Sequence, residues 1–148
     1  MECKTVKKTF RVLGIKGSGT FAHFGTEIPK LAQQFLGRLD EIENHSGTEI
    51  ALFEPKRDAD HLEGNYYVGV MVNEPLNKVP VGMDYIETTH DYVTTRGEIN
   101  NIGNLHNILL KWTNNQGYKR DLEAYIIETY HPMENGVEEV EIYLPITT

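Results

Sequence analysis

Two acidic side chains each stand two residues before a tyrosine near the carboxyl end of the chain. Glu128 precedes Tyr130, and Glu141 precedes Tyr143. Residues two apart in an extended strand point to the same face, so each pair would place a carboxylate beside an aromatic ring. Carboxylates with aromatic neighbours are typical of sites that bind organic cations, through charge and cation–π attraction. The same pairs could perform acid–base chemistry, with Glu128 as the base and Tyr130 or Tyr143 as the proton donor.

Glu128 interrupts a strand face that is otherwise apolar. That face consists of Leu122, Ala124, Ile126, Glu128 and Tyr130. A carboxylate in this position lies near water at the strand's end or is held in a pocket, where a cationic ligand would offset its desolvation. In the closing strand, alternate residues from Val140 to Ile146 form a core face, and Glu141 and Tyr143 take the opposite face. The spacing alone leaves open whether the two strands form a pocket.

Other kinds of site have weaker support. Gly17 and Gly19 open a glycine-rich loop, but the predicted helix begins too late for a dinucleotide site, and no Walker lysine follows. Neither serine lies in a nucleophile motif. The six histidines lack metal-ligand spacing, and we expect solvated or loop positions for His23, His45, His61, His90, His106 and His131. We therefore predict neither a cofactor nor a metal.

The composition excludes several classes of protein. The 148 residues include 14 basic and 22 acidic side chains, a net charge of −8. DNA binding depends on basic side chains that neutralise phosphates, and with no basic stripe we expect no direct nucleic-acid binding. No apolar run could span a membrane, and the first residues lack the apolar core of a signal peptide. The single cysteine, Cys3, excludes an intramolecular disulfide. We expect a cytoplasmic protein that does not bind membranes.

The sequence predicts two similar sets of strands and helices, which would position the candidate site residues. Strands are predicted at 5–16, 49–53 and 66–72 in the first half and at 83–95, 122–130 and 137–146 in the second. An apolar stripe from Ile28 to Ile42 predicts one helix, capped by Thr26 with Pro29 in its first turn, and 99–114 predicts another. Aligning Ile28 with Ile102 superposes the two apolar stripes. We predict an α+β fold made by tandem duplication of a strand-helix-strand-strand module, at about 1–75 and 76–148, with about eight mostly antiparallel strands and two helices.

Several segments resemble the GyrI-like small-molecule-binding family, also described as bacterial transcription-activator effector-binding domains. They are 79–83 (VPVGM), 92–97 (YVTTRG), 108–112 (ILLKW), 127–130 (IETY) and 140–146 (VEIYLPI). The resemblance implies one domain over residues 1–148, with a cleft between its two modules. Regulator members of the family carry a DNA-binding domain, which this sequence lacks, so the chain is similar to the stand-alone members.

The resemblance also implies a function. In members that bind drugs, glutamates and tyrosines of the two closing strands hold lipophilic cations, and the matching positions here are Glu128, Glu141 and Tyr143. Further candidates for the cleft wall are Tyr130, Trp112, Tyr67 and Tyr85. We expect a sensor or sequestering protein for small aromatic cations. Two alternatives remain open: a hydrolase of strained cyclopropyl electrophiles that uses Glu128 with Tyr130 or Tyr143, and an inhibitor that binds DNA gyrase.

Overall fold

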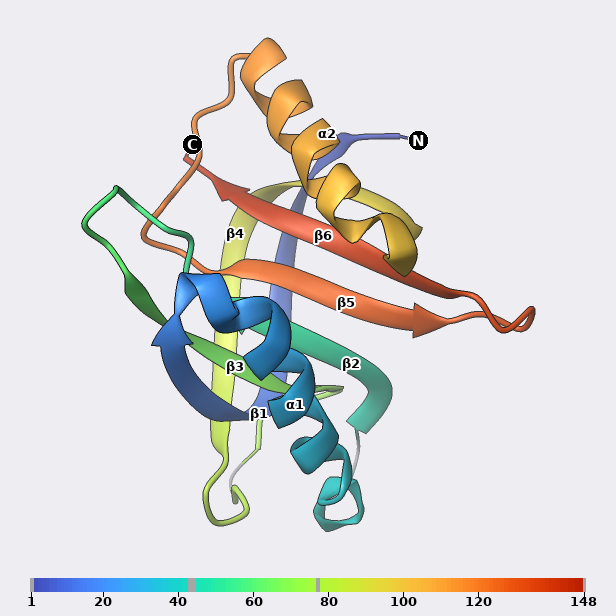
Figure 1. The fold of residues 1–148 in the computed structure, drawn as a ribbon. Coiled ribbons are helices and arrows are strands. Elements are labelled where there is room, and N and C mark those ends of the chain that lie inside the picture. Colours follow the sequence, from blue (N-terminus) through green and yellow to red (C-terminus); the bar gives the residue numbers. More distant parts are fainter. Residues whose placement is uncertain (1, 43–44, 77, 148) are drawn as a thin grey trace.

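Six antiparallel strands close into a barrel in the computed structural model, which describes residues 2–42, 45–76 and 78–147 (Figure 1). The strands are β1 (Lys4–Thr20), β2 (His45–Phe53), β3 (Glu63–Val72), β4 (Asp84–Glu98), β5 (Ile126–Pro132) and β6 (Glu138–Ile146). Their order around the barrel is β1-β3-β2-β5-β6-β4, and β4 pairs with β1 to close it. The predicted α+β class and antiparallel pairing are confirmed. The predicted count of about eight strands is wrong: the described residues form six strands, one for each of the six segments predicted from the sequence. The longest are β1 and β4, with 17 and 15 residues.

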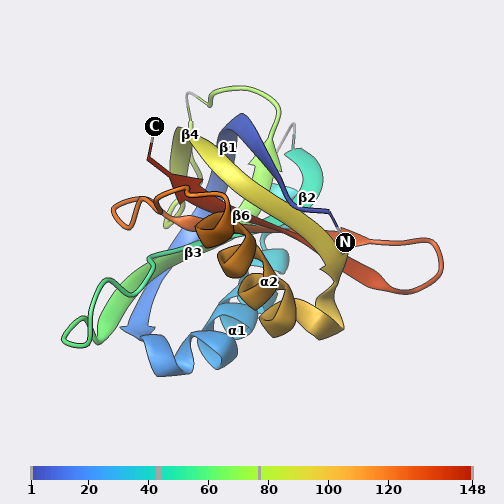
Figure 2. The ribbon, with the colours of Figure 1, turned by 90° about the horizontal axis from the view of Figure 1, so that it is seen from above.

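Two helices, α1 (Phe24–Leu36) and α2 (Ile102–Asn115), lie on the same side of the barrel (Figure 2). Each half of the chain runs strand, helix, strand, strand, as the sequence predicts. The two helices begin at Phe24 and Ile102, so the predicted alignment of Ile28 with Ile102 is displaced by one helical turn. The predicted first turn is also wrong: α1 begins before Thr26, and Pro29 lies inside the helix. No helix in the described ranges is long and apolar enough to cross a membrane.

Apolar side chains pack in three clusters. The barrel interior holds Phe10, Val12, Ile50, Leu52, Tyr92, Ile127 and Tyr143. A second cluster lies outside the barrel, and we call it the α1 cluster. It includes Leu13, Phe35, Ala51, Val68 and Val70, with further apolar residues of α1 packed against it. A third cluster, the α2 cluster, is the other outer cluster. It includes Leu105 and Leu109 of α2 with Val93, Val140, Ile142, Leu144 and Ile146. Each helix therefore covers one part of the barrel's outer surface, and β5 crosses between the two helices in Figure 1.

Candidate ligand-binding site

Glu128 lies where the two halves of the chain meet. Its strand, β5, belongs to the second half and pairs with β2 of the first half, where Ala51 is directly opposite Glu128. On its other edge, Glu128 is opposite Ile142, which packs under α2. Directly opposite residues point to the same face, so Glu128 faces the helices rather than the barrel interior. It is 7% exposed, and Ala51 beside it is 1% exposed.

Two side chains hold the Glu128 carboxylate. The Tyr130 hydroxyl donates to Oε1 at 2.7 Å, and Nε2 of His106, on α2, lies 2.6 Å from Oε2. An ionised carboxylate can only accept hydrogen bonds, so His106 donates from Nε2. Burial, then the charge of Glu128 and the hydrogen bond to it, raise the pKa of the Tyr130 phenol well above its ordinary value. Tyr130 therefore remains a protonated donor at neutral pH.

Two further carboxylates surround Tyr130. Glu49 of β2 is directly opposite Tyr130. On β6, Val140 is opposite Tyr130, and Glu138, two residues before Val140, lies on the same face. Burial and then the charge of Glu138 raise the pKa of Glu49. Within the described residues, neither Glu49 nor Glu138 forms a salt bridge. Glu49 and Glu138 therefore add negative charge to this face without an ion-pair partner in the described part of the chain.

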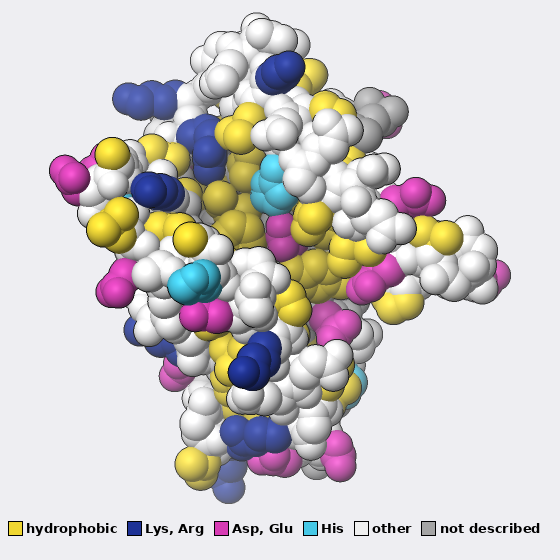
Figure 3. Space-filling model, in the orientation of Figure 1, with side chains coloured by type: hydrophobic (Ala, Val, Ile, Leu, Met, Phe, Trp, Pro, Cys, Tyr) yellow, Lys and Arg dark blue, Asp and Glu magenta, His cyan; other side chains and the backbone are white. Residues whose placement is uncertain are grey.

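Aromatic and apolar side chains complete this face. Tyr130 packs against both outer clusters, and Phe53 of β2 lies 6.4 Å from the His106 ring and 6.3 Å from the Phe24 ring at the start of α1. The view onto the two helices shows a hollow between them that is lined by hydrophobic side chains, with acidic and histidine side chains beside it (Figure 3). We call the face formed by Glu49, Ala51, Phe53, Glu128 and Tyr130, together with His106, the interhelical groove.

Glu141 and Tyr143 lie on the opposite face of β6. Tyr143 is directly opposite Ile127 and belongs to the barrel interior, where it is 3% exposed. Its hydroxyl donates to Oε2 of Glu141 at 3.0 Å, and burial strongly raises the pKa of this phenol. Arg96 Nη1 and His131 Nε2 lie 3.3 and 3.4 Å from Oε1 of Glu141. The Glu141 charge is thus compensated by the protein and separated by the sheet from Glu128.

The remaining candidates for the cleft wall lie in three different places. Tyr67 packs against the barrel interior, with its ring 6.0 Å from that of Tyr125. Tyr85 packs at the edge of the α1 cluster and donates its hydroxyl to Glu87 at 2.8 Å. Trp112 packs against the α2 cluster, 6.0 Å from the Tyr118 ring. Of the predicted site residues, the structure brings Glu128 and Tyr130 together in the groove, and Glu141 and Tyr143 together on the other face of the sheet.

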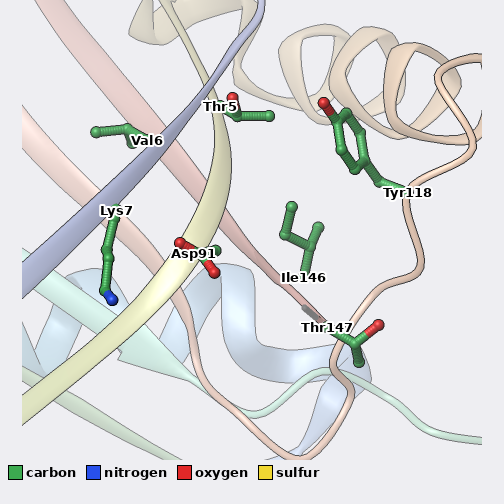
Figure 4. Close-up of a pocket in the computed structure, with 7 residues that line it drawn as sticks. All are labelled: Thr5, Val6, Lys7, Asp91, Tyr118, Ile146 and Thr147. Atoms are coloured by element: carbon green, nitrogen blue, oxygen red, sulfur yellow. The ribbon is translucent and has the colours of Figure 1, made fainter.

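A separate cavity of about 350 Å³ lies at the other end of the sheet (Figure 4). Its lining residues are Thr5, Val6, Lys7, Asp91, Tyr118, Ile146 and Thr147. Lys7 and Asp91 are directly opposite each other on β1 and β4, so this cavity presents both signs of charge. We place the candidate site in the interhelical groove instead, because the buried carboxylate of Glu128 lies there beside two partly buried carboxylates, Glu49 and Glu138, that form no salt bridge among the described residues.

Residues 2–147 match the model of the GyrI-like small molecule binding domain. The chain belongs to this family. No curated protein sequence matches the chain significantly. This GyrI-like domain is similar to the solved structure of SAV2435 bound to tetraphenylphosphonium, with a TM-score of 0.72 and 14% identity over 99% of this chain and 94% of that one.

Two other solved structures share the fold of this GyrI-like domain. The C-terminal domain of EcmrR matches with a TM-score of 0.65 and 13% identity, over 99% of this chain and 98% of that domain. A hydrolase from Listeria innocua matches with a TM-score of 0.61 and 10% identity, over 99% of this chain and 92% of that one. At these identities the likeness shows a common fold, on which different activities are possible.

Sequence reasoning missed four residues of the groove, which are His106, Glu49, Ala51 and Phe53. The sequence predicts His106 on the surface or in a loop, but it lies on α2 with its side chain 23% exposed and bonds Glu128. Glu49 and Phe53 of β2 share the face of Ala51, which the alternation of apolar Ile50 and Leu52 could have indicated. Their proximity to Glu128 depends on the β2–β5 pairing, which no local pattern reveals. No group of three or more His, Cys, Asp or Glu side chains among the described residues is arranged to hold a metal ion.

Proposed function

We propose that this GyrI-like domain binds small aromatic cations in the interhelical groove, as a sensor or sequestering protein. The observation that carries the proposal is the buried carboxylate of Glu128, at the junction of the two halves of the chain, with two more carboxylates nearby. Buried charges in proteins are usually paired. A bound cation would add positive charge beside Glu128, whose partners in the protein are His106 and Tyr130.

The groove also suits the aromatic part of such a ligand. Phe53 and Tyr130 offer ring surfaces on the same face as Glu128, and Ala51, at the centre, has a small side chain. A cation near aromatic faces gains cation–π attraction in addition to the charge interaction. Glu128 itself is fixed by His106 and Tyr130, so little side-chain entropy is lost when a ligand binds. SAV2435, which shares this fold, was solved bound to tetraphenylphosphonium, a lipophilic cation, and that complex is consistent with the proposal.

Binding can be tested with two probes of the same shape and opposite charge. Tetraphenylphosphonium and tetraphenylborate both present four phenyl rings around a charged centre. The proposal predicts that the phosphonium binds in a titration followed by calorimetry or tryptophan fluorescence, and that the borate binds at least ten-fold more weakly. Equal affinities would show that apolar contact alone drives binding, and the cation proposal would then fail.

Hydrolysis is a second candidate function, favoured by the hydrogen bonds around Glu128. The carboxylate could accept a proton from an attacking water, and Tyr130, whose pKa is raised, could donate to a leaving anion. A strained three-membered ring needs only modest assistance because opening it releases strain. The test is incubation with a cyclopropyl-activated electrophile, followed by mass spectrometry. More than one equivalent of ring-opened product, abolished by Glu128→Gln, would establish hydrolysis, whereas recovery of intact compound from the complex would leave binding as the function.

A further inference from the structure

The cavity at the end of the sheet contains two opposite charges that do not pair with each other. Lys7 of β1 and Asp91 of β4 are directly opposite, and both line the cavity. The Cβ atoms of directly opposite residues in antiparallel strands are about 5 Å apart. No salt bridge joins Lys7 to Asp91, and neither has another ion-pair partner in the described part of the chain. Both charges are therefore available to a ligand.

The same two strands carry another pair of opposite charges, and that pair does bond. Arg11 and Glu87 are also directly opposite on β1 and β4, and Arg11 Nε lies 3.2 Å from Oε1 of Glu87. The register of β1 and β4 therefore allows opposite charges to meet across the strands. The open arrangement of Lys7 and Asp91 is a local feature of the cavity.

Apolar and aromatic side chains adjoin the two charges. Asp91 is also directly opposite Ile146 of β6, so Lys7, Asp91 and Ile146 form one row across three strands on one face of the sheet. Tyr118, in the segment after α2, lines the cavity as well, and its ring centroid lies 6.0 Å from that of Trp112. Figure 4 shows Ile146 and Tyr118 close together, with Asp91 between them and Lys7. The cavity is therefore charged on one side and apolar on the other.

The size and exposure of the cavity suit a small molecule. Its volume of about 350 Å³ is near the lower end of the range for ligand sites, about 300–1,000 Å³. Lys7 is exposed and Asp91 is half-buried, so a ligand can reach both charges from solvent. Because Lys7 and Asp91 are neighbours across two strands, a ligand that binds both must carry its own two charges close together.

We propose that this cavity is a second binding site, separate from the interhelical groove, for a free amino acid with an aromatic side chain. The ammonium of the amino acid binds the Asp91 carboxylate, and its carboxylate binds Lys7 Nζ. An α-amino acid carries these two charges on one carbon atom, which matches the adjacent charges of the cavity. Its ring packs against Tyr118 and Ile146, since aromatic side chains favour contact with other rings. This site does not depend on the function proposed for the groove.

The test titrates L-phenylalanine calorimetrically into the full chain, with 3-phenylpropanoate, which lacks only the ammonium group, as the matched probe. L-Phenylalanine should bind in the millimolar range or more tightly, as expected for a ligand of its size, and 3-phenylpropanoate about ten-fold more weakly. Asp91→Asn and Lys7→Met should each weaken the binding of L-phenylalanine by about ten-fold. Glu87→Gln removes a charge from the same strand outside the cavity and should leave the affinity unchanged.

The outcomes distinguish this site from the interhelical groove. L-Phenylalanine should not displace tetraphenylphosphonium, and Asp91→Asn should not change the affinity for tetraphenylphosphonium. The cavity proposal is wrong if L-phenylalanine does not bind at about 10 mM, if it binds Asp91→Asn as tightly as the unsubstituted protein, or if it competes with tetraphenylphosphonium. If tetraphenylphosphonium does not bind while L-phenylalanine depends on Asp91 and Lys7, the function proposed for the groove fails and the second site stands.

Discussion

Glu128 and Ala51 are directly opposite each other across the β2–β5 pairing that joins the two halves of the chain. A carboxylate is thereby paired with the smallest side chain that still carries a Cβ, at the centre of the face between the helices. For the proposed site, the small size of the Ala51 side chain is as important as the charge of Glu128. This relationship leads to the first prediction.

Enlarging residue 51 should block the groove without altering its charge. Ala51→Val adds two methyl groups beside Glu128, and we expect affinity for tetraphenylphosphonium to fall by at least ten-fold. Because Ala51 is 1% exposed, overpacking should also destabilise the protein by about 1–3 kcal/mol. Titration at a temperature where the variant is folded separates the two effects. Unchanged affinity in a folded Ala51→Val variant would mean that the ligand binds elsewhere.

His106 should stabilise the protein through its bond to Glu128. Removing the imidazole leaves the buried carboxylate with one donor fewer, so His106→Ala should lower the free energy of unfolding by about 1.5–3 kcal/mol, measured by urea denaturation. His23→Ala is the control, because His23 bonds the Thr20 hydroxyl at an exposed position and its loss should change stability by less than about 0.5 kcal/mol. Equal effects of the two substitutions would argue against the His106–Glu128 interaction.

The pKa of Glu49 predicts how the stability of the protein depends on pH. A raised pKa means that the folded state binds the proton more tightly than the unfolded state, so stability is lost as the pH rises from the unfolded carboxyl value of about 4.3 through the folded value. Glu49→Gln cannot ionise and should escape this loss. We expect its melting temperature to exceed that of the unsubstituted protein at neutral pH, and the difference to shrink in acid. A less stable Glu49→Gln variant at neutral pH would contradict the repulsion between Glu49 and Glu138.

The Tyr130 phenol should resist ionisation. Burial and the adjacent Glu128 charge raise its pKa, so the difference between the ultraviolet pH titrations of the unsubstituted protein and Tyr130→Phe should show no phenolate at about pH 10, where a free tyrosine is half ionised. Other tyrosines cancel in this difference. A phenol that titrates near its ordinary value would show that Tyr130 is hydrated and does not bond the buried carboxylate.

The strands and helices could be predicted from the sequence, but the pairing of the strands in the barrel could not. Alternation located the six strands, although β5 begins at Ile126 and not at residue 122. The apolar stripes located both helices, although α1 ends at Leu36 and not near Ile42. The same alternation placed Glu128 and Tyr130 on one face. It did not reveal that Glu128 is opposite Ile142 and therefore faces away from Glu141, since the relative register of two strands depends on the whole barrel. His106 and Glu49 joined the site through contacts between elements far apart in the chain. The predicted gyrase inhibition remains a prediction.

The most direct test compares the affinity of tetraphenylphosphonium for Glu128→Gln and Glu141→Gln. Both substitutions preserve side-chain shape and remove one negative charge, but Glu128 faces the groove and Glu141 is paired with Arg96 on the other side of the sheet. We predict that Glu128→Gln weakens binding by about ten- to a hundred-fold, the equivalent of about 1.5–3 kcal/mol, and that Glu141→Gln changes it less than about three-fold. Equal affinities for the two variants, or a larger loss in Glu141→Gln, would contradict a cation site at Glu128.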